Sequence, residues 1–199
     1  MEENPKTDPF GDGVTEETKK IARDNALKFG LYLGAIGILI GLAVYFFNPF
    51  LLFTNLPFIF LIILITIALE VYFCVELRKS LGGFWNFKLA FSSIFIMLLI
   101  SAVLSIIYQT LLFKVIDKEL PEKIRNSTLE MVKKIYSDAG ITGDKYDKGI
   151  QETNDRLKDL GSPVYLLKNF FMGILVNTIL ALILAAIFKK EKPIFSTSA

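Results

Sequence analysis

Four long apolar stretches dominate the sequence and constrain its fold more than any other feature. They cover residues 29–47, 57–77, 89–113 and 164–188. A helix of about 20 apolar residues crosses the hydrocarbon core of a bilayer. The stretches are continuous and lack the alternation of a membrane strand, so helices that satisfy their own backbone hydrogen bonds are favoured over a β-barrel. The sequence predicts an all-α polytopic membrane protein with four transmembrane helices.

The composition agrees with this fold class. Of the 199 residues, 53% are hydrophobic, compared with roughly 45–50% in a soluble domain. The third stretch has no charged residue between Lys88 and Lys114, whereas the second contains Glu70 and the fourth contains Lys168 and Asn177. The apolar residues are therefore gathered into spans and not spread at the periodicity of a soluble core.

The ends of the stretches carry helix-breaking and helix-starting residues. Asn48-Pro49 follows the first stretch, and Pro57 opens the second at a position where a first helical turn tolerates proline. Gly82-Gly83 predicts a turn after the second, and Ser162-Pro163 predicts an N-cap followed by proline at the start of the fourth. The aromatic rings that follow Gly83 are expected at headgroup depth. They are Phe84, Trp85 and Phe87.

The distribution of lysine and arginine predicts the topology. The connection between the first two spans has neither residue, whereas three short flanks are basic. Cytoplasmic flanks carry an excess of Lys and Arg, so we expect both termini and the connection after the second span in the cytoplasm. The basic residues of these flanks are Lys19, Lys20, Arg23, Lys28, Arg78, Lys79, Lys88, Lys189, Lys190 and Lys192.

Residues 15–192 are predicted to form one four-helix membrane domain between two tails. Residues 1–14 are rich in Pro, Gly and acids, which is typical of a disordered cytoplasmic tail, and residues 193–199 form a second flexible tail. From Thr15 the chain is expected to turn helical and run into the first span. The insert 118–161 shows helical spacing on both sides of Gly140–Gly143 and predicts an extracytoplasmic helical hairpin with a solvated charged face.

Several kinds of chemistry are excluded by residues that the chain lacks. It has no histidine and one cysteine, Cys74. A Ser-His-Asp triad, a Cys-His dyad, a histidine-containing zinc site or a CxxC redox pair cannot be built from this set. The net charge of +2 is not that of a nucleic-acid-binding protein. We therefore predict no catalytic residue, no metal and no cofactor.

Two helix faces carry small residues at helical spacing. In the first span they are Gly30, Gly34, Gly37 and Gly41; in the fourth they are Gly173, Ala181 and Ala185, with Asn177 among them. Small residues let membrane helices approach closely. The two faces are expected either to pack on each other within one bundle or to form the seam of a homodimer.

A polar seam follows the third span at multiples of four residues. Such side chains either line a path for a polar substrate or serve as hydrogen bonds between helices, and the second interpretation is favoured. Asn177 is interpreted in the same way, as a residue that fixes helix register. The seam consists of Ser93, Ser101, Ser105 and Gln109.

Glu70 is the acidic residue that lies deepest inside a predicted span, since Glu76 is at the end of the same span. Glu70 lies about two turns, roughly 12 Å, from the basic edge at Arg78-Lys79. An ionisable group at that depth is a candidate for function, for example as a protonatable carboxyl of a coupled transporter. The structural alternative is a glutamate that stays neutral or reaches a polar partner or the cytoplasmic interface.

The sequence also resembles a known family. The resemblance rests on RKSLGGFWNFKLAF at 78–91, on Val115-Ile116-Asp117, on the helical insert, on Gly161-Ser162-Pro163 and on the ending LILAAIFKK at 182–190. These features, in this order, resemble a family of small bacterial four-helix membrane proteins known as a domain of unknown function, over about Lys28 to Lys192. The resemblance implies an inner-membrane location and the same four spans. It supplies no catalytic residue, cofactor or substrate.

Three functions remain open at this point. The favoured hypothesis is a non-enzymatic inner-membrane protein that acts as an accessory or scaffold for a membrane partner, in contact with the lipid bilayer and with that partner or a second copy. The alternative is a small oligomeric transporter or channel that uses Glu70 and the polar seam. An enzyme acting on lipid is disfavoured, because no nucleophile has a base beside it.

Overall fold

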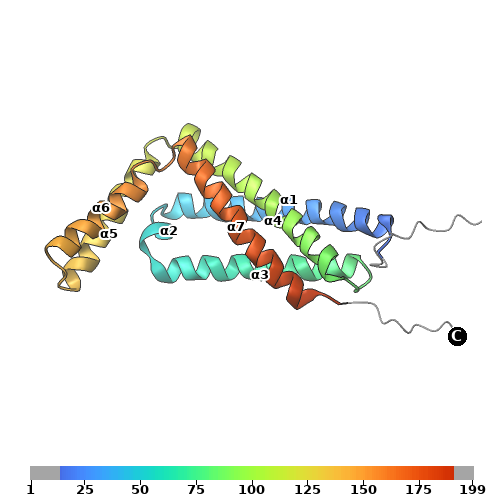
Figure 1. Cartoon of the computed structure of the whole chain (residues 1–199). Helices are drawn as coiled ribbons and strands as arrows, with labels where there is room; N and C mark the ends of the chain where they lie inside the picture. Colours follow the sequence, from blue (N-terminus) through green and yellow to red (C-terminus); the bar gives the residue numbers. More distant parts are fainter. Residues whose placement is uncertain (1–13, 191–199) are drawn as a thin grey trace, which may run out of the picture. The chain divides into compact units, whose positions relative to one another are not determined.

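The computed structural model describes residues 14–190, and these residues are almost entirely helical (Figure 1). The disordered tail predicted for residues 1–14 lies outside the described residues except for Val14, and the predicted tail 193–199 lies wholly outside them. Within residues 14–190 the extended structure is limited to one isolated β-bridge, between Trp85 and Lys190. The all-α prediction is confirmed. The helices are α1 (Glu16–Phe47), α2 (Leu51–Thr54), α3 (Leu56–Ser80), α4 (Phe87–Leu111), η1 (Leu112–Ile116), α5 (Leu120–Asp138), α6 (Asp144–Leu157) and α7 (Pro163–Phe188).

Four of these helices are long and apolar enough to cross a membrane: α1, α3, α4 continued by η1, and α7. Only 17–28% of the residues in their most apolar stretches are buried within the chain. A soluble bundle would place such side chains in its core, whereas a membrane helix leaves them facing lipid, which is as apolar as they are. The protein is therefore a membrane protein with four apolar helices at the predicted positions.

Capping hydrogen bonds mark the starts of α3 and α7, and the cap predicted at Ser162 is confirmed. Asn55 Oδ1 accepts a hydrogen bond from the backbone N–H of Phe58 at 3.0 Å. Ser162 Oγ accepts one from the N–H of Tyr165 at 3.1 Å. Each cap satisfies one of the backbone donors that a helix leaves open at its N-terminus. Gly82 and Gly83 have φ of +73° and +83°, a conformation that favours glycine, so the predicted turn is formed.

Two local features were not predicted. The connection between the first two spans holds the one-turn helix α2, which begins after Asn48 Oδ1 accepts a hydrogen bond from the N–H of Phe50 at 3.0 Å. The end of the third span widens into the π-helix η1, where the N–H of Asp117 donates to the carbonyl of Leu112 at 2.9 Å. A π-turn adds one residue per turn and so rotates the chain before the extended Asp117.

The chain groups into two compact units, and each uses part of every membrane-crossing helix. We call residues 14–36, 67–103 and 173–190 the basic unit, because it holds the described basic flanks. Residues 37–66 and 104–172 form the hairpin unit, which contains α2, η1, α5 and α6. Each unit is described by itself below.

The basic unit has a core that draws on all four membrane-crossing helices. Much of it is small: alanines on α1, α4 and α7 and Cys74 on α3 are fully or almost fully buried. Trp85, expected at headgroup depth, is only 1% exposed and belongs to this core, so its ring packs within the protein and not on its surface. Its backbone pairs with Lys190 in both directions, with N···O distances of 2.6 and 2.8 Å. This bridge draws the loop inward and places the indole among core residues. The buried set is Ala22, Ala26, Leu33, Phe73, Cys74, Leu77, Trp85, Leu89, Ala90, Ile94, Met97, Leu98, Ala181, Leu184 and Ala185.

The hairpin unit has a smaller buried core of bulky residues around η1 and the first turns of α5. Its buried members are Leu112, Phe113, Leu120, Ile124 and Leu166. The aromatic rings of Tyr45, Phe50, Phe53 and Tyr108 pack against them while remaining partly exposed. Helices α5 and α6 lie side by side, as Figure 1 shows, and confirm the predicted helical hairpin. Gly140 and Gly143, both with positive φ, make its turn.

Candidate functional site

Glu70 is the most unusual side chain in the membrane-crossing helices. It lies on α3 within the basic unit and is only 7% exposed. Its neighbours on the same helix, Phe73 and Cys74, are also buried. The Oε2 atom is buried and has no hydrogen-bond partner. The structure therefore places this carboxyl group next to apolar side chains and gives Oε2 no hydrogen-bond partner.

An unpaired buried oxygen of this kind is uncommon. Removing a polar group from water without a compensating hydrogen bond costs about 1–3 kcal/mol, and most buried polar atoms in proteins find a partner. A group of three or more side chains suited to bind a metal is not found in the described part of the chain. Within the described residues Glu70 is thus a buried carboxyl group that is not part of such a cluster.

The polar seam predicted on α4 does not stay on one face. Ser93 is buried and donates to the carbonyl of Leu89 at 2.7 Å. Ser101 is half-buried, whereas Ser105 is exposed and lies 3.2 Å from Gln109 Nε2, which donates to it. Steps of four residues exceed the 3.6-residue turn, so Ser105 is rotated by about 120° from Ser93. The four side chains do not form one continuous buried polar line.

Ser93 illustrates how a polar side chain can be satisfied without an interhelical partner. Its hydroxyl donates to the backbone of its own helix, four residues back, a common arrangement for Ser and Thr in membrane helices. Thr66 on α3 and Thr178 on α7 do the same, at 2.9 and 2.7 Å. Asn177, next to Thr178, is half-buried.

Gly30 on α1 is a site of close helix packing. A Cβ atom added there would lie 2.6 Å from the carbonyl oxygen of Met97 and 2.9 Å from Cβ of Ile100. Both neighbours belong to α4, so at this glycine the partner helix is α4, whereas the sequence suggested α7 or a second copy. The distance means that the backbone of α1 approaches that of α4 directly, as small residues permit.

The other glycines of α1 have different surroundings. Gly34 is buried, and a Cβ added to Gly41 would lie 2.8 Å from Cε1 of Tyr108 within the hairpin unit. Gly37 is exposed, and no atom lies within 4 Å of an added Cβ. Small residues on one helix face therefore differ in whether the chain itself fills the space beside them.

The small residues of α7 divide in the same way. Ala181 and Ala185 are completely buried in the core of the basic unit. Gly173 has no atom within 4 Å of an added Cβ. The part of the predicted stripe nearest the end of α7 is used for packing within the chain, and the glycine at its other end is open.

Sequence reasoning missed two buried polar atoms of aromatic side chains. Nε1 of Trp85 and Oη of Tyr108 are both buried without a hydrogen-bond partner. The tryptophan was read as an interfacial ring, and the tyrosine was read as part of the apolar run of the third span. A tyrosine in an otherwise uncharged span is a signal that could have indicated a buried hydroxyl group.

Comparison with known proteins identifies the family but no better-characterised relative. Neither the curated proteins nor the solved structures contain a match. The sequence pattern of a family described as "Protein of unknown function (DUF4199)" matches residues 28–190. The match includes all of α3, α4 and α7, most of α1 and the whole helical hairpin, in agreement with the resemblance drawn from the sequence. This membrane protein therefore belongs to the DUF4199 family of proteins of unknown function.

Proposed function

We propose that this protein is a non-enzymatic accessory or scaffold protein that binds a membrane partner through the open glycine faces of its membrane-crossing helices. The observation that carries the proposal is the empty space beside Gly37 on α1 and Gly173 on α7. In a bilayer, helix association depends on close packing of small residues and not on a hydrophobic driving force. A glycine without a neighbour is therefore a position where a helix of another molecule can approach.

Gly37 contrasts with Gly30 on the same helix. The space beside Gly30 is already occupied by α4, since an added Cβ would lie 2.6 Å from the carbonyl oxygen of Met97. At Gly37 no atom lies within 4 Å of an added Cβ. Glycine lowers helix stability relative to alanine by roughly 0.5–1 kcal/mol. A glycine that contributes no internal packing supports a role for this face outside the chain.

The proposed location is the bacterial inner membrane, with both termini and the loop after α3 in the cytoplasm. Support comes from the distribution of charge: the basic unit contains the start of α1, the end of α3, the start of α4 and the end of α7, and each carries Lys or Arg. Residues 48–56, in the hairpin unit, have no Lys or Arg. The positive-inside rule assigns the basic ends to the cytoplasm, and the helical hairpin then lies on the opposite side.

Affinity purification of the full chain in mild detergent tests the accessory role. Three proteins are compared: the natural sequence, Gly37→Ile, and Ala35→Ile as a matched control. Ala35 is also exposed but lies about 200° around the helix from Gly37. We expect the natural protein and Ala35→Ile to retain a stoichiometric membrane partner or a second copy, and Gly37→Ile to retain at least about tenfold less.

Two results would contradict this proposal. The first is recovery of the natural protein alone, as a monomer, from membranes of its own host. The second is a partner that is retained equally by Gly37→Ile and by the natural sequence. Equal loss from both isoleucine variants would assign the effect to added bulk on α1 and would also remove the argument for Gly37.

A second candidate function is a small transporter or channel that uses the carboxyl group of Glu70. The observation that favours it is the unpaired, buried Oε2 atom, because an intramembrane carboxyl group without a partner is a candidate proton or cation site. The scattered polar side chains of α4 do not add support.

Proteoliposomes with the natural protein and with Glu70→Gln test this function. Glu76→Gln is the control, since Glu76 lies on the same helix and pairs with Lys79 at 2.6 Å. Flux that Glu70→Gln abolishes and Glu76→Gln preserves favours a transporter; no flux of protons, ions or small solutes by the natural protein excludes it.

A further inference from the structure

Asn177 is a polar side chain in the middle of α7. It lies 14 residues after Pro163 and 11 residues before Phe188, which is about 21 and 16 Å from the two ends of the helix. The side chain is half-buried. At this depth the lipid chains offer neither a hydrogen-bond donor nor an acceptor, so an amide group that is not paired with protein is costly.

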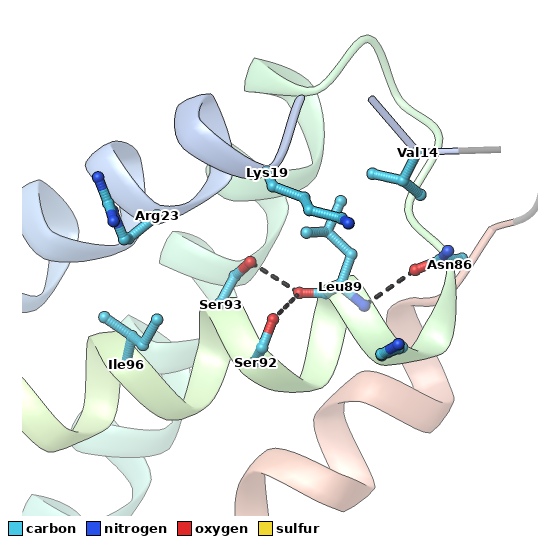
Figure 2. Close-up of a pocket in the computed structure, with 9 residues that line it drawn as sticks. Val14, Lys19, Arg23, Asn86, Leu89, Ser92, Ser93 and Ile96 are labelled. Atoms are coloured by element: carbon cyan, nitrogen blue, oxygen red, sulfur yellow. Dashed lines mark hydrogen bonds between the residues drawn. The ribbon is translucent and has the colours of Figure 1, made fainter. Parts of the chain in front are cut away.

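Other polar side chains of the membrane-crossing helices bond to the backbone of their own helix. Figure 2 shows this for Ser92 and Ser93 of α4, which line a cavity of the basic unit and both donate to the carbonyl of Leu89, at 3.1 and 2.7 Å. Thr178 of α7 donates to the carbonyl four residues before it, at 2.7 Å. Within residues 14–190 the side chain of Asn177 makes no hydrogen bond. Its donor and its acceptor are therefore both available to another molecule.

Asn177 lies at the border between two faces of α7. On one side are Ala181 and Ala185, about 40° and 80° around the helix axis from Asn177, and both are completely buried in the core of the basic unit. On the other side are Leu180 and Ile183, at about 60° and 120°. Leu180 is half-buried and Ile183 is 51% exposed. Helix α7 thus packs on its own chain with one face and leaves the face on the other side of Asn177 open.

The open face has the spacing of a contact between two helices. Its residues follow one another at steps of 3, 4, 3 and 4, the repeat with which two helices pack along their length. Val176 and Ile187 are 56% and 66% exposed. No atom lies within 4 Å of a Cβ added to Gly173, one turn before Asn177, so the helix of another molecule can approach the backbone there. We call this face the α7 seam; it consists of Gly173, Val176, Leu180, Ile183 and Ile187.

We propose that the α7 seam binds the α7 seam of a second copy of this chain, with the Asn177 amides of the two copies hydrogen-bonded to each other. An amide carries both a donor and an acceptor, so it is complementary to itself, and a two-fold axis places the same residue of two copies opposite one another. Two copies that insert with the same topology have parallel α7 helices. A single asparagine in such a parallel apolar contact fixes its register and the number of helices. The inference rests on the proposed function, because it names the partner at α7 as a second copy.

Energy transfer between donor-labelled and acceptor-labelled full-length chains tests the association in dioleoylphosphatidylcholine vesicles, at a series of protein-to-lipid ratios. Asn177→Leu removes the amide with little change in volume. Thr178→Val is the matched control, because it removes a polar group from the next residue, whose hydrogen bond is already made within α7. We expect the natural chain to dimerise and Asn177→Leu to weaken the dimer about tenfold or more, since two interhelical hydrogen bonds are lost. Thr178→Val should weaken it by less than about threefold.

Disulfide cross-linking in the same vesicles locates the contact independently. In a Cys74→Ala background, Val176→Cys on the α7 seam is compared with Leu175→Cys. Leu175 is 61% exposed but faces about 120° away from the middle of the seam. Because a disulfide needs Cβ atoms about 4 Å apart, Val176→Cys should cross-link at least about tenfold faster than Leu175→Cys. The fluorescence of the buried Trp85 checks that each variant is folded.

Three results would overturn the inference. They are a natural chain that stays monomeric at every protein-to-lipid ratio, a dimer that Asn177→Leu and Thr178→Val weaken equally, and equal cross-linking at the two cysteine positions. A chain that is monomeric in vesicles but retains a different membrane protein in the affinity purification overturns this inference and leaves the accessory role intact. A dimer that depends on Asn177, with equal retention of partners by Gly37→Ile and the natural sequence, supports this inference and contradicts the role proposed for Gly37.

Discussion

The basic unit and the hairpin unit use the same four membrane-crossing helices but bury different kinds of residues. In the basic unit alanines, a cysteine and Gly30 let backbones approach, and the core includes side chains from all four helices. In the hairpin unit the buried core consists of bulky residues of η1, α5 and α7, and the aromatic rings beside it remain partly exposed. Small residues thus contribute to the larger buried core of the first unit, whereas the smaller core of the second has only large side chains.

This difference has a consequence for stability and for function. A tightly packed core has no room for change, so substitutions there should be strongly destabilising. A loosely enclosed unit tolerates substitutions and offers surface to other molecules. We expect the basic unit to hold most of the folding free energy, and the substitutions below test that expectation from the largest effect to the smallest.

The largest effect is expected at Trp85. Trp85→Ala removes a side chain that is 1% exposed in the core of the basic unit, and truncation of a buried aromatic residue costs about 3–5 kcal/mol. Trp85→Phe is the matched control: it keeps most of the ring volume and removes an Nε1 that has no partner, so it should cost less than about 1.5 kcal/mol. Unfolding by sodium dodecyl sulfate, followed by circular dichroism, measures both. A small loss for Trp85→Ala would contradict the burial of the indole in this core.

A smaller loss is expected at Gly30. In Gly30→Ala the new Cβ would meet the carbonyl oxygen of Met97 at 2.6 Å, and because this is a backbone atom the helices must separate, which costs about 2 kcal/mol. Gly37→Ala on the same helix enters open space and should be neutral or stabilise by up to about 1 kcal/mol. The fluorescence of Trp85, the one tryptophan of the chain, reports unfolding of both. Equal stability of the two variants would contradict the close packing of α1 on α4.

Replacement of Glu70 should change stability in the opposite direction. Glu70→Leu removes a buried oxygen that has no hydrogen-bond partner and keeps a similar volume, so we expect the free energy of unfolding to rise by about 1–2 kcal/mol. The same detergent titration measures this gain, with Glu76→Leu as the control on α3. A stable Glu70→Leu variant shows that the carboxyl group is retained at the expense of stability, as functional groups often are. A loss of stability would instead mean that Glu70 has a partner that this fold does not provide.

The sequence was sufficient for the fold because the signals for it are local. The apolar stretches, Pro57 at the start of a helix, Ser162 as a cap, and Gly82-Gly83 as a turn each act within a few residues. The same local signals did not reveal that Trp85 is buried within the protein, since an aromatic residue after a turn at the end of a span is typical of the membrane interface. Its burial depends on a backbone bridge to Lys190, which is far away in the sequence.

The candidate sites were less predictable because they depend on neighbouring helices. Glycine spacing predicted a packing face. It did not predict that α4 occupies the space beside Gly30 or that the space beside Gly37 is empty. Glu70 was singled out in the sequence as a carboxyl group inside a span, but the lack of a partner for Oε2 depends on all neighbouring helices.

The smallest effect is expected at Gly41, the counterpart of Gly30 in the hairpin unit. A Cβ added there would lie 2.8 Å from Cε1 and 3.1 Å from Oη of Tyr108. These atoms are at the end of a side chain that can rotate, and the Oη has no hydrogen bond to lose. Gly41→Ala should therefore change the free energy of unfolding by less than about 1 kcal/mol, since the helical preference of alanine offsets the displaced ring. The detergent titration used for Gly30→Ala measures it, and Gly41→Ala combined with Tyr108→Leu should be no less stable than Tyr108→Leu alone. A loss at Gly41 as large as that at Gly30 would show that the hairpin unit is packed as rigidly as the basic unit, and the contrast between the two units would not hold.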